Sequence, residues 1–231
     1  MIKIKKEIIN ITNNVTDKYD GPDRDKKVFT YIYTKLAHHI DYDKFASDTC
    51  SLSGYDYEVT ERVREDASNL IGGLIYGKSL CSGYSEILRN VLSEVGIDCI
   101  YISGKLKDQK GSHAWNQVYL DENWYNVDLT NDRDKIVNGI ECKHFLKGDQ
   151  DFDRYKKYDV ISPRLEICKE SVQNPEQLFN EYKYVQPTVT PKDIAHATHS
   201  KNIHFTDIFN IKSLFNKLIH KSQDIDKETS R

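Results

Sequence analysis

The sequence predicts a mixed fold in which helical stretches are followed by a run of antiparallel strands. Two stretches, near residues 25–40 and 81–95, repeat apolar residues at the three-and-four spacing of one helical face. Strand patterns fill much of residues 97–130, and the last two are separated only by Asp121 and Glu122, which is typical of a hairpin. The chain has 231 residues, of which 38% are hydrophobic and 30% charged, so it can bury one main core.

The first helical pattern covers residues 25–40, and its apolar residues share one face. They are Val28, Tyr31, Ile32, Leu36 and Ile40. Residues 41–58 mix Ser, Gly, Asp and Tyr without periodicity, which predicts a long loop. Residues 61–70 form at best a short polar helix.

The clearest helix follows the glycine-rich stretch GGLIYGKSLCSGY at residues 72–84. Its apolar residues fall on one helical stripe. They are Tyr84, Ile87, Leu88, Val91, Leu92 and Val95. Gly96 stands where a left-handed cap would end the helix, and Cys81 lies at or just before its first turn.

Strand patterns dominate the middle of the chain. Residues 97–103 are rich in β-branched and aromatic types, which favours a strand, and residues 104–111 read as a polar loop. Residues 113–120 and 123–130 are predicted to pair as a hairpin. Beyond the hairpin the pattern weakens, and only residues 145–146 indicate another strand, at a sheet edge.

The chain is predicted to divide into three parts. Residues 1–184 form the main domain, residues 185–204 a linker with two prolines near its start, and residues 205–231 a C-terminal helix and tail. The C-terminal helix is amphipathic. Docking on the domain is the commonest fate of such a helix, with a protein partner or a membrane surface as alternatives.

Charge and hydropathy argue against several classes of partner. The formal net charge is -3, from 33 basic and 36 acidic residues spread along the chain, so nucleic acid is not the expected partner. No stretch approaches the roughly 18 apolar residues of a transmembrane helix.

The cysteines and the amino-terminal residues favour a cytoplasmic location. Five cysteines are an odd number at scattered spacings without a C-x-x-C pair, as expected for free thiols in a reducing compartment. Residues 1–20 lack the continuous apolar core of a signal peptide. An effector exported without a cleaved signal would show the same features.

Cys81 is the candidate nucleophile. The free N–H groups and the dipole at a helix N-terminus favour the thiolate, so a cysteine placed there has a lowered pKa. Ser82 and Gly83 are small enough to let a substrate approach the backbone, where amides can stabilise an oxyanion.

The hairpin register brings a histidine and a carboxylate together. If Asp121 and Glu122 form the tight turn, Asp128 lies opposite Trp115, two residues from His113 and on the same face. Diagonal neighbours in an antiparallel pair lie about 7–8 Å apart at the backbone, within reach of an Asp-His hydrogen bond. Asp128 is therefore predicted to orient His113 as a general base, and Trp115 to line a substrate groove beside it.

Alternative interpretations of these polar residues remain open. Cys81, His113 and Asp128 are all types that bind zinc, although they lack an evident fourth ligand. Cys142 and His144, and the histidines between residues 196 and 204, do not offer four ligands at a familiar spacing and are expected in solvated segments. No metal or cofactor is therefore expected.

Two stretches, GKSLCSGYSEILRNVLSEVGI at residues 77–97 and HAWNQVYLDENWYNVDLT at residues 113–130, resemble the transglutaminase-like superfamily, which is related to papain-like proteases. The resemblance covers roughly residues 25–150. It implies an α+β fold with the cysteine helix packed on an antiparallel sheet. It also implies Cys81 as nucleophile and His113 and Asp128 as its partners. The tryptophan that completes the oxyanion hole in some members is replaced by Leu74, Ile75 and Tyr76.

The resemblance implies acyl transfer through a thioester on the cysteine, with a protein or peptide as substrate. Hydrolysis, by a protease or deamidase, is favoured over transglutamination, because a small domain has little surface on which to position a second protein. The alternatives are a non-catalytic peptide-binding module on the same fold and a metal-dependent hydrolase. The abundance of Lys, Ile, Asn, Asp and Tyr favours a bacterial source.

Overall fold

The computed structural model describes residues 2–48, 57–108 and 110–186. The chain divides into two units, residues 1–185 and 186–231, and the description below concerns the first. The predicted C-terminal helix and nearly all of the predicted linker lie outside the described residues. The predicted domain boundaries therefore stay predictions.

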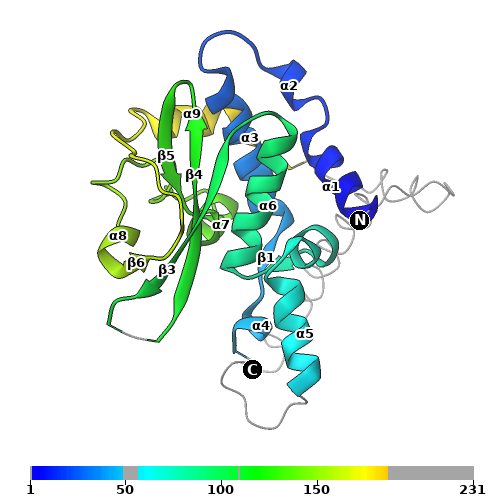
Figure 1. Cartoon of the computed structure of the whole chain (residues 1–231). Coiled ribbons are helices and arrows are strands. Elements are labelled where there is room, and N and C mark those ends of the chain that lie inside the picture. The colour runs from blue at the N-terminus through cyan, green and yellow to red at the C-terminus, as the bar shows by residue number, and fades with distance from the viewer. Residues whose placement is uncertain (1, 49–56, 109, 187–231) are drawn as a thin grey trace, which may run out of the picture. The chain divides into compact units, whose positions relative to one another are not determined.

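Helices form most of the amino-terminal half of the described chain (Figure 1). In chain order they are α1 (Ile2–Thr12), α2 (Val15–Lys18), α3 (Arg24–His39), α4 (Lys44–Asp48), α5 (Tyr57–Ala67), the π-helical turn η2 (Gly72–Tyr76) and α6 (Cys81–Glu94). Three more follow the strands or lie between them, namely α7 (Leu129–Val137), α8 (Arg154–Lys157) and α9 (Pro175–Tyr182). The helix predicted over residues 25–40 is α3, and the helix that begins at Cys81 is α6.

A four-stranded antiparallel sheet lies beside these helices, with the strand order β5-β4-β3-β6. Its strands are β3 (Cys99–Leu106), β4 (Ser112–Leu120), β5 (Asn123–Val127) and β6 (Tyr158–Val160). Helix α6 packs on β3 and β4, while α8 lies on the other side of the sheet (Figure 1). A separate two-stranded parallel pair joins β1 (Asp41–Tyr42) to β2 (Lys78–Ser79). The mixed class with a helix on an antiparallel sheet is therefore confirmed.

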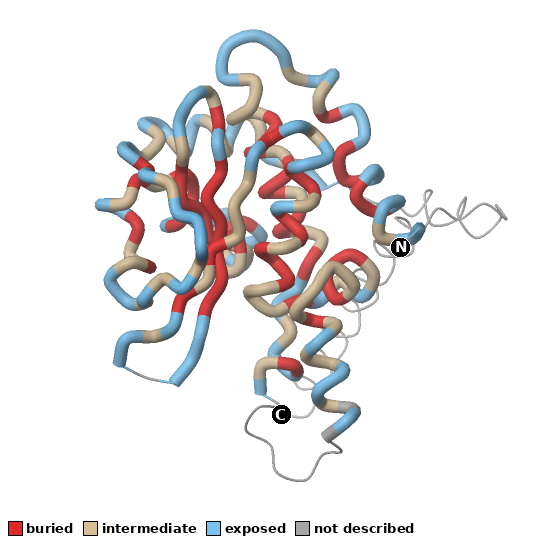
Figure 2. The backbone as a smooth tube through the Cα atoms, in the orientation of Figure 1, coloured by how far each residue is buried: buried red, intermediate tan, exposed pale blue. Residues whose placement is uncertain are grey.

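Two groups of buried apolar residues cover the two faces of the sheet. The larger one joins α1, α3, α6 and α7 to the sheet, and Figure 2 shows it as the buried stretches along the helices and the central strands. The smaller one consists of Ile102, Trp115 and Phe152. Side chains alternate between the faces of a strand, so Trp115 lies on the face opposite to Asn116, whose side chain donates to the Ser85 carbonyl of α6.

The structure differs from the sequence predictions in several short elements and at the ends of some longer ones. Helix α1 was not predicted, and the expected loop over residues 41–58 contains β1, α4 and the start of α5. Strand β3 extends to Leu106, into the predicted polar loop. Strand β5 ends at Val127 because Asp128 caps α7. Instead of an edge strand at residues 145–146, there is an isolated bridge between Asn126 and Lys147.

Among the residues that the structure describes, no helix has both the length and the apolar character needed to cross a membrane.

Candidate active site

Cys81 is the first residue of α6, and only Leu80 separates this helix from β2. Close backbone packing fixes this position. A Cβ at Gly83 would lie 2.5 Å from the Ala67 carbonyl oxygen and 2.1 Å from Ser79 Oγ, so only glycine fits there. Ser79 in turn donates its hydroxyl to the same Ala67 carbonyl oxygen. The end of α5 and strand β2 therefore hold the first turn of α6, and with it Cys81, in place.

The β4–β5 hairpin has the register that the sequence predicted. Leu120 pairs with Asn123, and the pairing runs down to Asn116 opposite Val127. One residue further, Asp128 approaches His113, with its Oδ2 2.7 Å from the His113 Nε2. Asp128 is fully buried and His113 is 9% exposed, so this hydrogen bond is shielded from water.

His113 also interacts with the Cys81 thiol, because each group shifts the pKa of the other. Because Nε2 faces Asp128, Nδ1 is the ring nitrogen left for the sulfur. The structure therefore brings together the three side chains that the sequence singled out, in the order thiol, imidazole, carboxylate.

Two backbone amides also face the Cys81 sulfur, those of Ser82 and Ala114. The position of Ala114 on β4 leaves its backbone N–H outside the sheet pairing. Along a strand, successive N–H groups point to opposite neighbouring strands. The Tyr119 N–H donates to the Asp98 carbonyl on the β3 side, so the N–H groups of even-numbered β4 residues point to the β5 side. Pairing with β5 begins only at Asn116, so Ala114 lies beyond the last pair and its N–H points at the site.

The electrostatics of the site favour a thiolate beside an imidazolium. Burial opposes ionisation of Cys81 and is the largest single effect. However, the neighbouring His113 and the amides of Ala114 and Ser82 lower the pKa of Cys81 overall. Burial also works against a charged His113, but the hydrogen bonds to Asp128 and Cys81 raise the pKa of His113 to about 9.

Asn131, which the sequence reading did not single out, lies at the exposed edge of this group. Its Nδ2 is 2.8 Å from Asp128 Oδ2 and 3.1 Å from His113 Nε2, and its backbone N–H donates to Asp128 Oδ1. Both Nδ2 and a protonated Nε2 are donors, so the first contact is the hydrogen bond and the second is proximity alone. Asp128 is thus at once the cap of α7 and the partner of His113.

A second group of buried polar side chains adjoins the first. Arg154 Nε lies 3.2 Å from Asp128 Oδ2, and Arg154 Nη2 lies 2.7 Å from His144 Nε2. His144 Nδ1 is 3.2 Å from Oδ1 of the fully buried Asp132. Burial raises the pKa of Asp128, but His113, Arg154 and His144 outweigh it and lower that pKa overall.

The remaining predicted residues have mixed placements. Trp115 shares the face of His113, with ring centroids 6.1 Å apart, but it is completely buried. Gly83 faces the Ala67 backbone, so packing alone explains a glycine there, whereas Ser82 is half-buried beside Cys81. Roles in substrate binding for these three residues stay predictions.

The other described cysteines differ from Cys81. Burial raises the pKa of Cys99, Cys142 and Cys168. Cys142 and His144 are 8% and 6% exposed, so the expectation that they lie in a solvated segment was wrong. Within residues 2–48, 57–108 and 110–186, no group of three or more His, Cys, Asp or Glu side chains is arranged to hold a metal ion.

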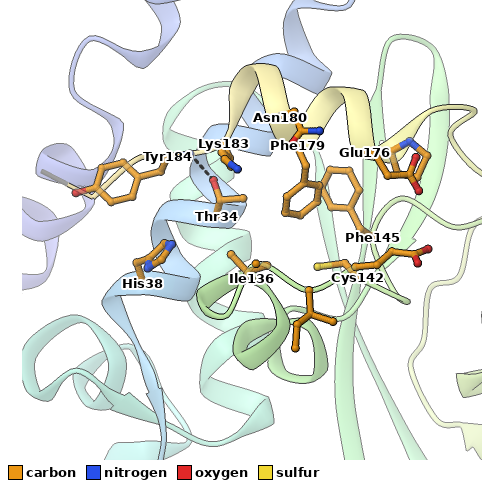
Figure 3. Close-up of a pocket in the computed structure, with 14 residues that line it drawn as sticks. Thr34, His38, Ile136, Cys142, Phe145, Glu176, Phe179, Asn180, Lys183 and Tyr184 are labelled. Carbon is orange, nitrogen blue, oxygen red and sulfur yellow. Dashed lines mark hydrogen bonds between the residues drawn. The ribbon is translucent and has the colours of Figure 1, made fainter. Parts of the chain in front are cut away.

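A pocket of about 210 Å³ opens elsewhere, between α3, α7 and α9 (Figure 3). Apolar side chains such as Ile136, Phe145 and Phe179 line it, and Tyr184 donates its N–H to Thr34 at its edge. Cys81, His113 and Asp128 do not line this pocket.

The sequence profile of the transglutaminase-like superfamily matches residues 10–129, just over half of the chain. The kyphoscoliosis peptidases of Mus musculus and Homo sapiens are each 28% identical to this chain over 109 residues. That match covers 43% of this chain and 14% of each peptidase. The crystal structure of a TGase aligns with 56% of this chain and 32% of its own, with a TM-score of 0.43 and 21% identity. Cys81, His113 and Asp128 lie inside the matched segment, and Arg154 lies beyond it.

Proposed function

Because the chain belongs to the transglutaminase-like superfamily, we propose that it is a cysteine-dependent acyl-transfer enzyme with Cys81 as nucleophile, His113 as base and Asp128 as the group that orients the base. The observation that carries this proposal is the hydrogen bond between His113 and the fully buried Asp128, beside a Cys81 thiol whose pKa His113 lowers. This order of groups is what thiol activation by a neighbouring base requires.

The mechanism begins with a thiolate and an imidazolium. The Cys81 thiolate attacks an amide carbon, and the developing oxyanion is stabilised by backbone amides at the start of α6. His113 gives its proton to the departing nitrogen, so an amine or ammonia leaves and a thioester forms on Cys81. An acceptor then attacks the thioester while His113 takes its proton, and Cys81 is regenerated.

We propose water as the acceptor, so that the reaction is hydrolysis of a peptide or glutamine amide. The names of the sequence relatives, which are peptidases, support this choice. A glutamine-containing peptide, incubated with and without a primary amine and analysed by mass spectrometry, separates the outcomes. Cleavage or a mass gain from deamidation supports hydrolysis, whereas preferential incorporation of the amine would make the protein a transglutaminase.

The first test is the pH dependence of iodoacetamide alkylation at Cys81, read by mass spectrometry. In the wild type, we expect Cys81 to react with a midpoint well below the roughly 8.5 of an ordinary thiol. His113→Ala removes the imidazolium and should restore an ordinary midpoint. Cys99, Cys142 and Cys168 serve as internal controls, because their raised pKa predicts slow alkylation in the same sample.

The second test uses Cys81→Ala, which should abolish turnover and leave the circular dichroism spectrum unchanged. Undiminished turnover in this variant would end the proposal. If Cys81 instead titrates as an ordinary thiol in both the wild type and His113→Ala, a non-catalytic peptide-binding module becomes the better account.

A further inference from the structure

Arg154 is a buried cation that contacts Asp128, Asp153 and His144. It begins α8 and is 7% exposed. Its Nε lies 3.2 Å from Asp128 Oδ2 and 3.3 Å from Asp153 Oδ1. The Nε–H does not point along a hydrogen bond to either oxygen, so these contacts are ion pairs that act through charge.

His144 lies between the guanidinium of Arg154 and two carboxylates. Arg154 Nη2 is 2.7 Å from His144 Nε2, which is also 3.1 Å from Asp153 Oδ1. On the other side of the ring, His144 Nδ1 is 3.2 Å from Asp132 Oδ1. Asp132 is held in turn by the hydroxyl of Tyr33 on α3. Arg154 is thus anchored to the helical core on the side away from Asp128.

The oxygen that accepts the hydrogen bond from His113 is also the one that Arg154 approaches. Asp128 Oδ2 lies 2.7 Å from His113 Nε2 and 3.2 Å from Arg154 Nε. With the imidazole protonated, two cations share one fully buried carboxylate. Like charges at this separation disfavour each other, so the permanent charge of Arg154 weakens the stabilisation that Asp128 gives to the protonated form of His113.

We propose that Arg154 is a positioning residue, which acts through Asp128 by neutralising this buried carboxylate and so limits how strongly Asp128 stabilises the protonated form of His113. The catalytic meaning of this inference rests on the proposed function. In that reaction His113 must both gain a proton and release it to the departing nitrogen, and a carboxylate that faced His113 alone would make the release harder.

Other titratable groups also face this arrangement. Around His113 and Asp128 they are Cys81 from α6, Tyr158 from β6 and Arg154 from α8. Around Arg154 they are Asp153 and His144. Asp153 is paired with Lys157, and His144 lies next to Asp132. Asp132 also lies near Lys135. Among these groups, Arg154 is the cation in direct contact with Asp128 besides His113.

The test follows the titration of the His113 ring by NMR in full-length Cys81→Ala. This background removes the thiolate, so the measurement does not depend on whether the chain is an enzyme. Adding Arg154→Gln removes the charge but keeps a side chain that can donate hydrogen bonds. We expect the His113 midpoint to rise by about one pH unit. Adding Arg154→Lys keeps the charge and should leave the midpoint near that of Cys81→Ala alone.

Lys157→Gln is the matched control. Lys157 lies on the same helix and pairs with Asp153 at 2.9 Å, but it is exposed and does not contact Asp128. It should leave the His113 midpoint unchanged. An unchanged midpoint in Arg154→Gln overturns the inference, and so does a midpoint that falls towards the ordinary histidine value, because Arg154 would then serve only to hold Asp128 in place.

The same substitutions in the chain with Cys81 connect this titration to turnover. Arg154→Gln should lower kcat about tenfold and leave KM nearly unchanged, because Arg154 acts on the proton and not on the substrate. An unchanged kcat despite the NMR shift overturns the catalytic part of the inference. If Cys81 proves inert in the alkylation test, the proposed function fails while the NMR result still decides the role of Arg154.

Discussion

The pKa of Cys81 depends on a balance that a single neighbour can reverse. Burial favours the neutral thiol, and the lowering of the pKa comes from His113 and two backbone amides. His113 is charged at neutral pH because Asp128 and Cys81 raise its pKa to about 9. We expect any change that lets His113 lose its proton to return Cys81 to the behaviour of an ordinary buried thiol.

Asp128→Asn tests this balance. Asparagine is as good a helix cap as aspartate, so α7 should keep its first turn. The charge is lost, however, so the pKa of His113 should fall towards or below its ordinary value near 6.5. The imidazolium then disappears at neutral pH, and the alkylation midpoint of Cys81 should rise towards about 8.5 or higher.

Asp134→Asn is the matched control for Asp128→Asn. Asp134 lies on the same helix and its side chain is 77% exposed in a surface pair with Arg133. The alkylation midpoint of Cys81 should not change in this variant. An equal shift in both variants would mean that the net charge of the protein, and not the contact with His113, sets the thiol pKa.

The β4–β5 hairpin connects local conformation to the site, because its register decides which residue faces His113. Its turn residues are unusual for the conformation they adopt. Asp121 and Glu122 have φ values of 47° and 67°, the pair of positive values of a type I′ turn, which favours Asn-Gly or Asp-Gly. Part of the cost at Asp121 is offset by its ion pair with Lys26 of α3 at 3.1 Å.

Glu122→Gly should therefore stabilise the protein. A left-handed conformation costs an ordinary L-residue about 1–2 kcal/mol and glycine almost nothing. After the extra chain entropy of glycine, we expect the free energy of unfolding in urea to rise by about 0.5–1 kcal/mol. Glu122→Ala removes the same carboxylate without relieving the strain, so it should show no gain. Equal effects of the two substitutions would attribute the change to charge.

Apolar packing on both faces of the sheet holds the site between two groups of buried residues. One face packs against α6, which carries Cys81. On the other face, Phe152 packs near Trp115 and edge-on to His144, with ring centroids 6.2 and 5.9 Å away. Residues that follow the hairpin thus cover the second face and carry Arg154 to Asp128.

Phe152→Ala should destabilise the protein by about 3–5 kcal/mol, because it leaves a cavity in a small apolar cluster. Urea unfolding followed by tryptophan fluorescence measures this directly, since Trp115 lies in the same cluster. Ile161→Ala is the control. Ile161 is 55% exposed, so its truncation should change the stability by no more than about 0.5 kcal/mol. If both substitutions lowered the free energy of unfolding equally, the cluster of Ile102, Trp115 and Phe152 would not be a separate stabilising unit.

The sequence alone was sufficient to predict the elements that are specified by residues close together in the chain. The apolar stripe of α6, strand β3 and the β4–β5 hairpin with its register depend on neighbours a few residues apart, and these are present in the structure. The same register placed Asp128 near His113, because pairing across a two-residue turn allows little freedom. The short helices and the early end of β5 were missed, since caps and packing outweigh propensity there.

The residues that surround Cys81, His113 and Asp128 could be identified only from the tertiary structure. Arg154 lies 26 residues after Asp128 in a stretch without clear periodicity, and Tyr33 reaches Asp132 across 99 residues. Local pattern cannot specify contacts of this kind, because they arise only when α3, α7 and α8 pack around one core. Burial, which strengthens each of these charge interactions, is likewise a property of the folded chain.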